Sequence, residues 1–160
     1  MDNDNRDEKA NLWPDLLEKI RDVKFAMLTT ENEDGTLHSR PMATLRTKEE
    51  GFLWFFTGRS TLKAREIEHH SRVNLAYVSG DNETFVSVAG VGRLMEDTDK
   101  AEQLWNSDME AWFPQGLEDP DLALIQVEVG SVEYWSVASK RRTNLIRFAN
   151  YVDIFSRLVP

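Results

Sequence analysis

The sequence predicts a mainly β protein with flanking helices, in which short antiparallel strands form a small barrel. The first observation is a series of short apolar segments, rich in β-branched and aromatic residues, with turn residues between them. The second is the shortness of most connections, which favours antiparallel neighbours. The third is a long apolar segment that contains Gly90 and Gly92, as expected for a β-bulge or a barrel corner. Strands are expected at residues 23–30, 36–45, 51–57, 72–78, 84–95, 122–129 and 131–137.

The chain is predicted to open with a disordered tail and a short helix. Residues 1–11 are polar and acidic, and they have no apolar core of the kind found in a signal peptide. A helix is expected to begin at residues 13–15, because proline is favoured in a first turn. Leu16, Leu17 and Ile20 give this helix one apolar face, so we expect it to act as a lid or a plug.

The first two strands are predicted to form a hairpin about the pair Asp34-Gly35, which tolerates positive φ. Pro41 lies inside the second strand and implies a ladder edge, a bulge or a bend there. The third strand is expected to run antiparallel to the second, because the connection between them is short. Its apolar and aromatic run, residues 52–56, indicates burial on both faces and a place mainly in the core.

A helix is expected over residues 60–69, directly after the third strand and a break at Gly58. Its first turn carries the hydroxyls of Ser60 and Thr61 and, three residues after Ser60, the ammonium group of Lys63. Free backbone N–H groups, hydroxyls and an ammonium can converge there on one point, which suits a phosphate monoester. Ordinary helix capping with a solvated lysine would give the same pattern.

The C-terminal half is expected to contain helices in the gaps between strands. Asp97 is expected to cap an amphipathic helix whose apolar face runs from Ala101 to Met109. The loop at residues 112–116 is unusually apolar for a connection, so we expect something, such as a second subunit, to cover it. Gly130 is interpreted as a turn between the last two strands, and a terminal helix is expected over residues 145–158.

Length and composition favour one domain over residues 12–160 of a soluble, cytoplasmic protein. The 160 residues include no cysteine, which excludes disulfides and thiolate chemistry, and no apolar run long enough to span a membrane. The formal net charge of −9 disfavours a general binder of nucleic acid or anionic membranes. The segment from Ser139 onward nevertheless carries +4, and such a basic tail suits an anion site, subunit pairing or a solvated helix face.

The sequence has no recognisable motif for metal binding or hydrolysis. Its three histidines, His38, His69 and His70, have no metal-ligand spacing with carboxylates. A Walker loop, a Rossmann glycine fingerprint and a nucleophile elbow are also missing. Hydrolytic catalysis by the chain itself is therefore not expected, whereas the number of aromatic residues allows a planar heterocycle to be bound.

Four stretches carry a resemblance to a known family: residues 39–42, 54–63, 74–78 and 88–94. In order and spacing they resemble the FMN-binding split β-barrel proteins related to pyridoxamine 5′-phosphate oxidase, and more narrowly the general stress protein 26 group. The similarity extends from about Trp13 to Phe148. It implies a six- to seven-stranded antiparallel split barrel that forms a homodimer, with FMN bound at the interface.

The resemblance also implies roles for particular residues. Arg40 would pair with the FMN phosphate, since its planar fork allows bidentate contact, and Lys63 would add a point charge. Thr57 and Ser60 would donate hydrogen bonds to the same phosphate. The expected cofactor contacts are Arg40, Pro41, Met42, Phe56, Thr57, Ser60, Thr61, Lys63, Ser87, Trp112 and Trp135, the two tryptophans coming from the partner subunit.

The activity implied by the resemblance is that of an FMN-dependent oxidoreductase or flavin reductase acting on an unknown small molecule. A non-catalytic flavin-binding stress or sensor protein is an alternative, as is a barrel that holds a deazaflavin or haem. Pyridoxamine phosphate oxidase activity itself is not expected, because the arginines of residues 141–147 are not followed by the histidine of that enzyme's C-terminal Arg-x-His element. No residue is assigned as a catalytic acid or base.

Overall fold

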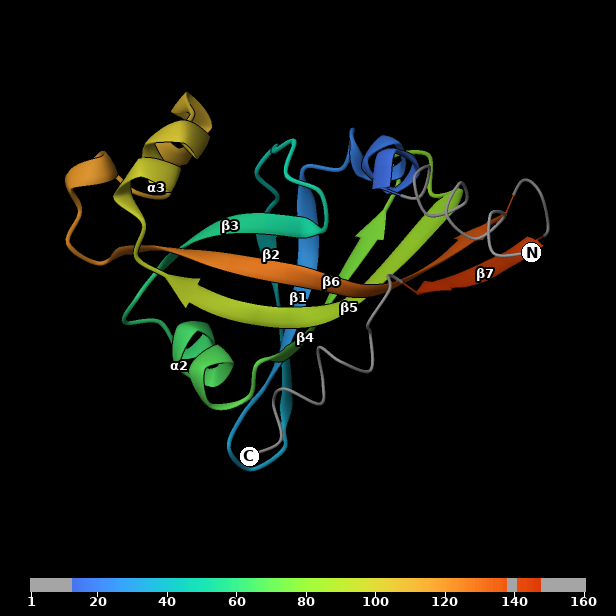
Figure 1. Ribbon diagram of the computed structural model, residues 1–160, viewed down its shortest axis with the longest axis horizontal. Coiled ribbons are helices and arrows are strands. Elements are labelled where there is room, and N and C mark those ends of the chain that lie inside the picture. The colour runs from blue at the N-terminus through green and yellow to red at the C-terminus, as the bar shows by residue number, and fades with distance from the viewer. Residues whose placement is uncertain (1–12, 138–140, 148–160) are drawn as a thin grey trace, which may run out of the picture.

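The computed structural model describes residues 13–137 and 141–147, which form a curled antiparallel sheet with helices at its edges (Figure 1). The predicted disordered tail at residues 1–11 lies outside the described residues. Seven strands form one sheet in the order β2-β1-β4-β5-β6-β3, with β7 also paired to β6. The strands are β1 (Phe25–Glu31), β2 (Leu37–Ala43), β3 (Phe52–Gly58), β4 (Arg72–Val78), β5 (Thr84–Met95), β6 (Leu122–Ser136) and β7 (Arg141–Arg147).

The third strand runs antiparallel to the predicted second strand at residues 36–45, as expected, but its ladder along its length is formed with β6. β3 pairs with β6 from Phe52 to Gly58, and on its other side Trp54 forms an isolated antiparallel bridge with Leu45, just after β2. The two faces of β3 pack into different hydrophobic clusters. Leu53 and Phe55 belong to the main core, whereas Trp54 and Phe56 belong to a second cluster. The predicted burial on both faces is thereby confirmed.

The glycines of β5 and β6 mark a bulge inside continuous strands. The β5–β6 register shifts at Gly90, which pairs with Val129, while Ala89 pairs with Ser131. Gly130 is therefore the extra residue of one 15-residue strand, and its interpretation as a turn between two strands was wrong. A Cβ on Gly90 would collide with the carbonyl oxygen of Glu128, so the close approach of the two backbones requires glycine there. The bulge predicted at Gly90 is confirmed.

The helices close the ends of the sheet. The helix at residues 13–20 packs Trp13, Leu16 and Ile20 into the main core, and it is therefore a plug. Helix α2 (Leu62–His69) follows β3 and lies against β1 and β5 (Figure 1). The second cluster is covered by α3 (Thr98–Leu104) and the short 3₁₀ helix η1 (Ser107–Ala111), and a second 3₁₀ helix, η2 (Gly116–Glu118), follows before β6.

Two predicted helices require correction. The helix after Asp97 ends at Leu104 because Trp105 is extended, and η1 begins anew where the Asn106 side chain accepts from the backbone N–H of Asp108. The terminal helix was expected to begin at Leu145, but residues 145–147 belong to β7, where pairing with β6 fixes an extended backbone. The remainder of that predicted helix lies outside the described residues.

Candidate functional site

A pocket of about 420 Å³ lies between β2, β3, the start of α2 and the aromatic segment around η1. Seven residues of the sequence-predicted site line it, namely Pro41, Met42, Phe56, Thr57, Thr61, Lys63 and Trp112. The other lining residues are Phe25, Ala43, Gly58, Met109, Phe113, Asp119 and Asp121. The structure thus brings together most of the predicted residues, and the volume is that of a site for a small organic ligand. Trp112 was expected to come from the partner subunit, but it lines the pocket of its own chain, where it packs on Phe25.

The apolar part of the pocket is built from aromatic rings in edge-to-face contact. Phe56 packs on Phe113 with 6.1 Å between ring centroids, and Phe25 packs on Trp112 at 6.4 Å. Trp112 is nevertheless 62% exposed, so the described residues leave most of this ring uncovered. Rings arranged in this way can enclose a planar heterocycle.

The polar end of the pocket is the start of α2. No side chain caps this helix, because the hydroxyl of Thr61, at the N-cap position, donates to the carbonyl of Gly58 at 2.7 Å. The first turn of the helix also has no acidic residue. The first backbone N–H groups of a helix have no intrahelical acceptor, so this turn presents donors together with the positive end of the helix dipole. Such a turn can accept an anion.

Lys63 supplies the cation at this end. Desolvation by burial, and secondarily the charge of Arg40, lower the pKa of Lys63. Within the part of the chain that the structure describes, its ammonium group forms no ion pair. A half-buried ammonium next to a second cation is unfavourable until an anion neutralises it, which makes Lys63 the best candidate for an anion contact in the pocket.

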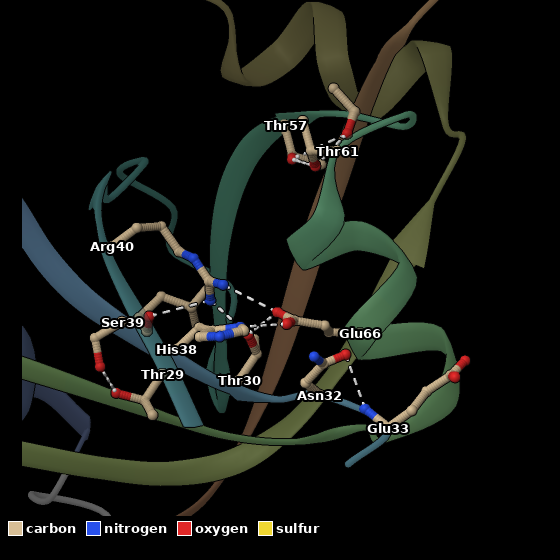
Figure 2. Close-up of polar contacts among 12 residues, drawn as sticks. Thr29, Thr30, Asn32, Glu33, His38, Ser39, Arg40, Thr57, Thr61 and Glu66 are labelled. Carbon is tan, nitrogen blue, oxygen red and sulfur yellow. Dashed lines mark hydrogen bonds and ion pairs between the residues drawn. The ribbon is translucent and has the colours of Figure 1, made fainter. Parts of the chain in front are cut away.

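Arg40 does not line this pocket, because its guanidinium is committed to a buried carboxylate (Figure 2). It donates to Glu66 Oε2 at 2.9 Å, to the Thr30 hydroxyl at 2.5 Å and to the carbonyl of Leu28 at 3.4 Å. His38 Nδ1 donates to the other oxygen of Glu66 at 2.7 Å. The alternation of β2 places His38, Arg40 and Met42 on one face, so Arg40 lies one step along the strand from the pocket.

Glu66 is the charged centre of this cluster, with only 2% of its side chain exposed. Burial acts to raise the pKa of its carboxyl group. Hydrogen bonds from Thr30, His38 and Arg40, together with the charge of Arg40, outweigh burial and leave the pKa below its usual value. The sequence pattern did not indicate Glu66, because nothing local shows that a helix glutamate faces an arginine 26 residues earlier.

Three other predicted residues are not free to act in the pocket of a single chain. Ser60 lies beside the pocket, but its backbone N–H and its hydroxyl both donate to Asp121. Ser87 lies on β5, where its hydroxyl accepts from Asn74 Nδ2 at 2.9 Å. Trp135 pairs across the sheet with Phe85, near the opposite end of β6 from the pocket.

The described residues contain no group of three or more histidine, cysteine or carboxylate side chains arranged to hold a metal ion. Among the helices in these residues, none has the length and hydropathy needed to cross a membrane. Among the described residues, the pocket is lined by aromatic rings, the start of α2, Lys63 and the carboxylates of Asp119 and Asp121.

The sequence matches a known protein family and a curated protein. The sequence model of the family described as pyridoxamine 5′-phosphate oxidase like matches residues 10–152. General stress protein 26 of Bacillus subtilis is 29% identical over 139 residues, which cover 82% of this chain and 96% of that protein.

Solved structures show the same fold. A Clostridium acetobutylicum protein related to general stress protein 26 matches with a TM-score of 0.74 and 18% identity, over 88% of this chain and 97% of that one. The general stress FMN/FAD binding protein of Xanthomonas citri matches with a TM-score of 0.69 and 26% identity, over 87% and 96%.

Proposed function

Because the chain belongs to the pyridoxamine 5′-phosphate oxidase-like family, we propose that it is a flavoprotein that binds FMN in the pocket between β2, β3 and α2. The observation that carries the proposal is that one pocket combines aromatic walls, the start of α2 without a side-chain cap, and Lys63, which forms no ion pair with any residue that the structure describes. FMN combines a planar aromatic ring system with a phosphate at the end of a polyol chain. The Xanthomonas citri relative, an FMN/FAD binding protein, supports the same ligand class.

Each part of the pocket has a role in this proposal. Phe56, Phe113 and Trp112 would contact the ring and exclude water from it, and Met42 would lie beside the ring or the ribityl chain. Lys63 and the first turn of α2 would hold the phosphate through charge-assisted hydrogen bonds. When bound, the flavin supplies the exchange of electrons with a small-molecule donor or acceptor, and the chain orients it.

The absorption spectrum of the purified protein tests the cofactor directly. We expect the two visible bands of an oxidised flavin, and a deazaflavin or haem spectrum would overturn the assignment. Apoprotein should then be titrated with FMN, FAD and riboflavin, following flavin fluorescence. Tightest binding of FMN is expected, and equal affinity for FMN and riboflavin would contradict a phosphate contact.

Turnover decides whether the flavoprotein is an enzyme. We propose an oxidoreductase, so NADH or NADPH should bleach the bound flavin under anaerobic conditions, and air should restore its colour. A flavin that remains oxidised with both donors would instead favour a flavin-binding stress or sensor protein that does not turn over. Free FMN at equal concentration is the control for the rate of reduction.

We further propose that the protein is a cytoplasmic homodimer. The exposed face of β1, β2, β4 and β5 is uncharged at its centre, where Met27 pairs with Pro41 on one side and with Ala76 on the other. Phe25 and Met27 are 42% and 43% exposed there. An uncharged, apolar patch on a sheet favours burial against a second copy.

This face also contains the predicted residues that are remote from the pocket of one chain. Ser87 stands next to Ala76 across β4 and β5, and Trp135 stands opposite Phe85. Phe25 and Pro41 belong both to this face and to the pocket lining. A partner that covers the face would therefore bring its own residues to the mouth of the pocket, and sedimentation at several protein concentrations tests the dimer.

A further inference from the structure

A carboxylate without a sequence motif lies beside the phosphate end of the pocket. Asp121 directly precedes β6, and the pairing of Gly58 with Leu122 brings it to the turn that leads into α2. Its Oδ1 accepts from the backbone N–H of Ser60 at 2.9 Å and its Oδ2 accepts from the Ser60 hydroxyl at 2.8 Å. Its carbonyl oxygen accepts from the N–H of Arg59 at 2.7 Å. Asp121 thus occupies the donors that a phosphate would need at Ser60.

The close approach of Asp121 depends on Gly58. A Cβ at this position would lie 2.7 Å from Oδ2 of Asp121 and 3.2 Å from Cγ2 of Thr61. The missing side chain leaves the space in which the carboxylate reaches Ser60. Gly58 therefore has two roles: it ends the strand before the helix, and it leaves room for the carboxylate of Asp121.

Asp121 and Lys63 line the same pocket with opposite charges. Among the described residues no ion pair joins the carboxylate to the ammonium group. A phosphate held by Lys63 and the first turn of α2 would lie in the same pocket as both charges. It would be attracted by Lys63 and repelled by the fixed charge of Asp121.

We infer that Asp121 is a specificity-determining residue of the pocket, which excludes the phosphate from Ser60 and lowers the preference for FMN over uncharged riboflavin. The inference rests on the proposed flavin site and adds a residue to it. Because the charge of Asp121 acts on the phosphate and leaves the ring contacts unchanged, it makes bound FMN easier to exchange. The pocket of this chain is accordingly suited to a flavin that is loaded and released.

The variant Asp121→Asn tests the inference, because the amide oxygen can still accept from Ser60 while the charge is removed. The dissociation constant for FMN should fall by about fivefold or more, whereas that for riboflavin should not change. Asp121→Ser is a second neutral variant with a side chain suited to helix capping, and it keeps the test decisive if the first variant does not fold.

The matched control is Glu96→Gln. It removes the same charge from a residue that pairs with Nε of Arg59 at 2.9 Å and does not line the pocket, so its ratio of flavin affinities should equal that of the wild type. An FMN affinity that is unchanged or lower in the Asp121 variants, or an equal change for both flavins, overturns the inference. Wild-type protein that binds neither flavin overturns the proposed function, and the inference with it.

Discussion

Two single variants, Lys63→Met and Arg40→Met, are expected to have different effects: the first should weaken FMN binding, and the second should lower the stability of the fold. Lys63 is unpaired among the described residues and lines the pocket, so Lys63→Met should remove a charge-assisted contact with the FMN phosphate worth about 1.5–3 kcal/mol. That value corresponds to a loss of FMN affinity of about tenfold to a hundredfold. Riboflavin affinity and stability should change little, because burial already disfavours the charged form of Lys63.

Arg40→Met should have the opposite profile. It leaves the buried carboxylate of Glu66 without its guanidinium partner, which typically costs about 3–5 kcal/mol of unfolding free energy. The affinities for FMN and for riboflavin should then change by the same factor.

The assays are urea unfolding for stability and flavin fluorescence titration for affinity. Arg65→Met is the matched control, since Arg65 is exposed on the same helix and its loss changes the net charge equally. The reasoning is refuted if Arg40→Met loses FMN affinity alone, with stability unchanged, while Lys63→Met retains it. That outcome would make Arg40 the main phosphate contact, as the family resemblance implies.

Three further predictions concern stability and assembly. Gly90→Ala should lower the unfolding free energy by about 1–3 kcal/mol, measured with urea, because its Cβ would press on the backbone of Glu128. Hydrogen bonds from Thr30, His38 and Arg40 hold the pKa of Glu66 in the folded protein below its ordinary value. The stability that this group contributes is therefore present above the ordinary pKa of a glutamate and is lost as the pH falls through the folded pKa. Unfolding followed from pH 7 down to pH 3 should therefore be less pH-dependent in Glu66→Gln. Met27→Lys, on the uncharged sheet face, should shift sedimentation toward the monomer, and an unchanged dimer would exclude this face as the interface.

The features that were predicted correctly depend on local pattern. The strand–turn–helix at residues 52–69 needs only a run of apolar residues, a glycine and a helix start, and the structure has all three. The split barrel predicted by the resemblance is confirmed by the fold shared with the Clostridium acetobutylicum protein. The roles of the predicted site residues toward a cofactor remain predictions.

The features that were missed depend on partners distant in sequence. Gly130 has the same local pattern whether it forms a turn or a bulge, and only its pairing with a strand some 40 residues earlier decides between them. Asp121 and Glu66 are ordinary acidic residues until the fold places Ser60 and Arg40 against them. The partners of both carboxylates are set by the three-dimensional fold, for which a single sequence carries no local signal, and Glu66 is in addition buried by it.

The single bridge between Leu45 and Trp54 has a consequence for how the barrel closes. β2 and β3 stand at the two ends of the strand order, and this bridge is the recorded backbone link between the segments that carry them. The pocket lies along the same boundary between β2 and β3, with Met42 of β2 on one side and Phe56 of β3 on the other. A ligand bound there would lie where β2 and β3 are not hydrogen-bonded to each other along their length. The bound ligand would therefore form part of the barrel wall.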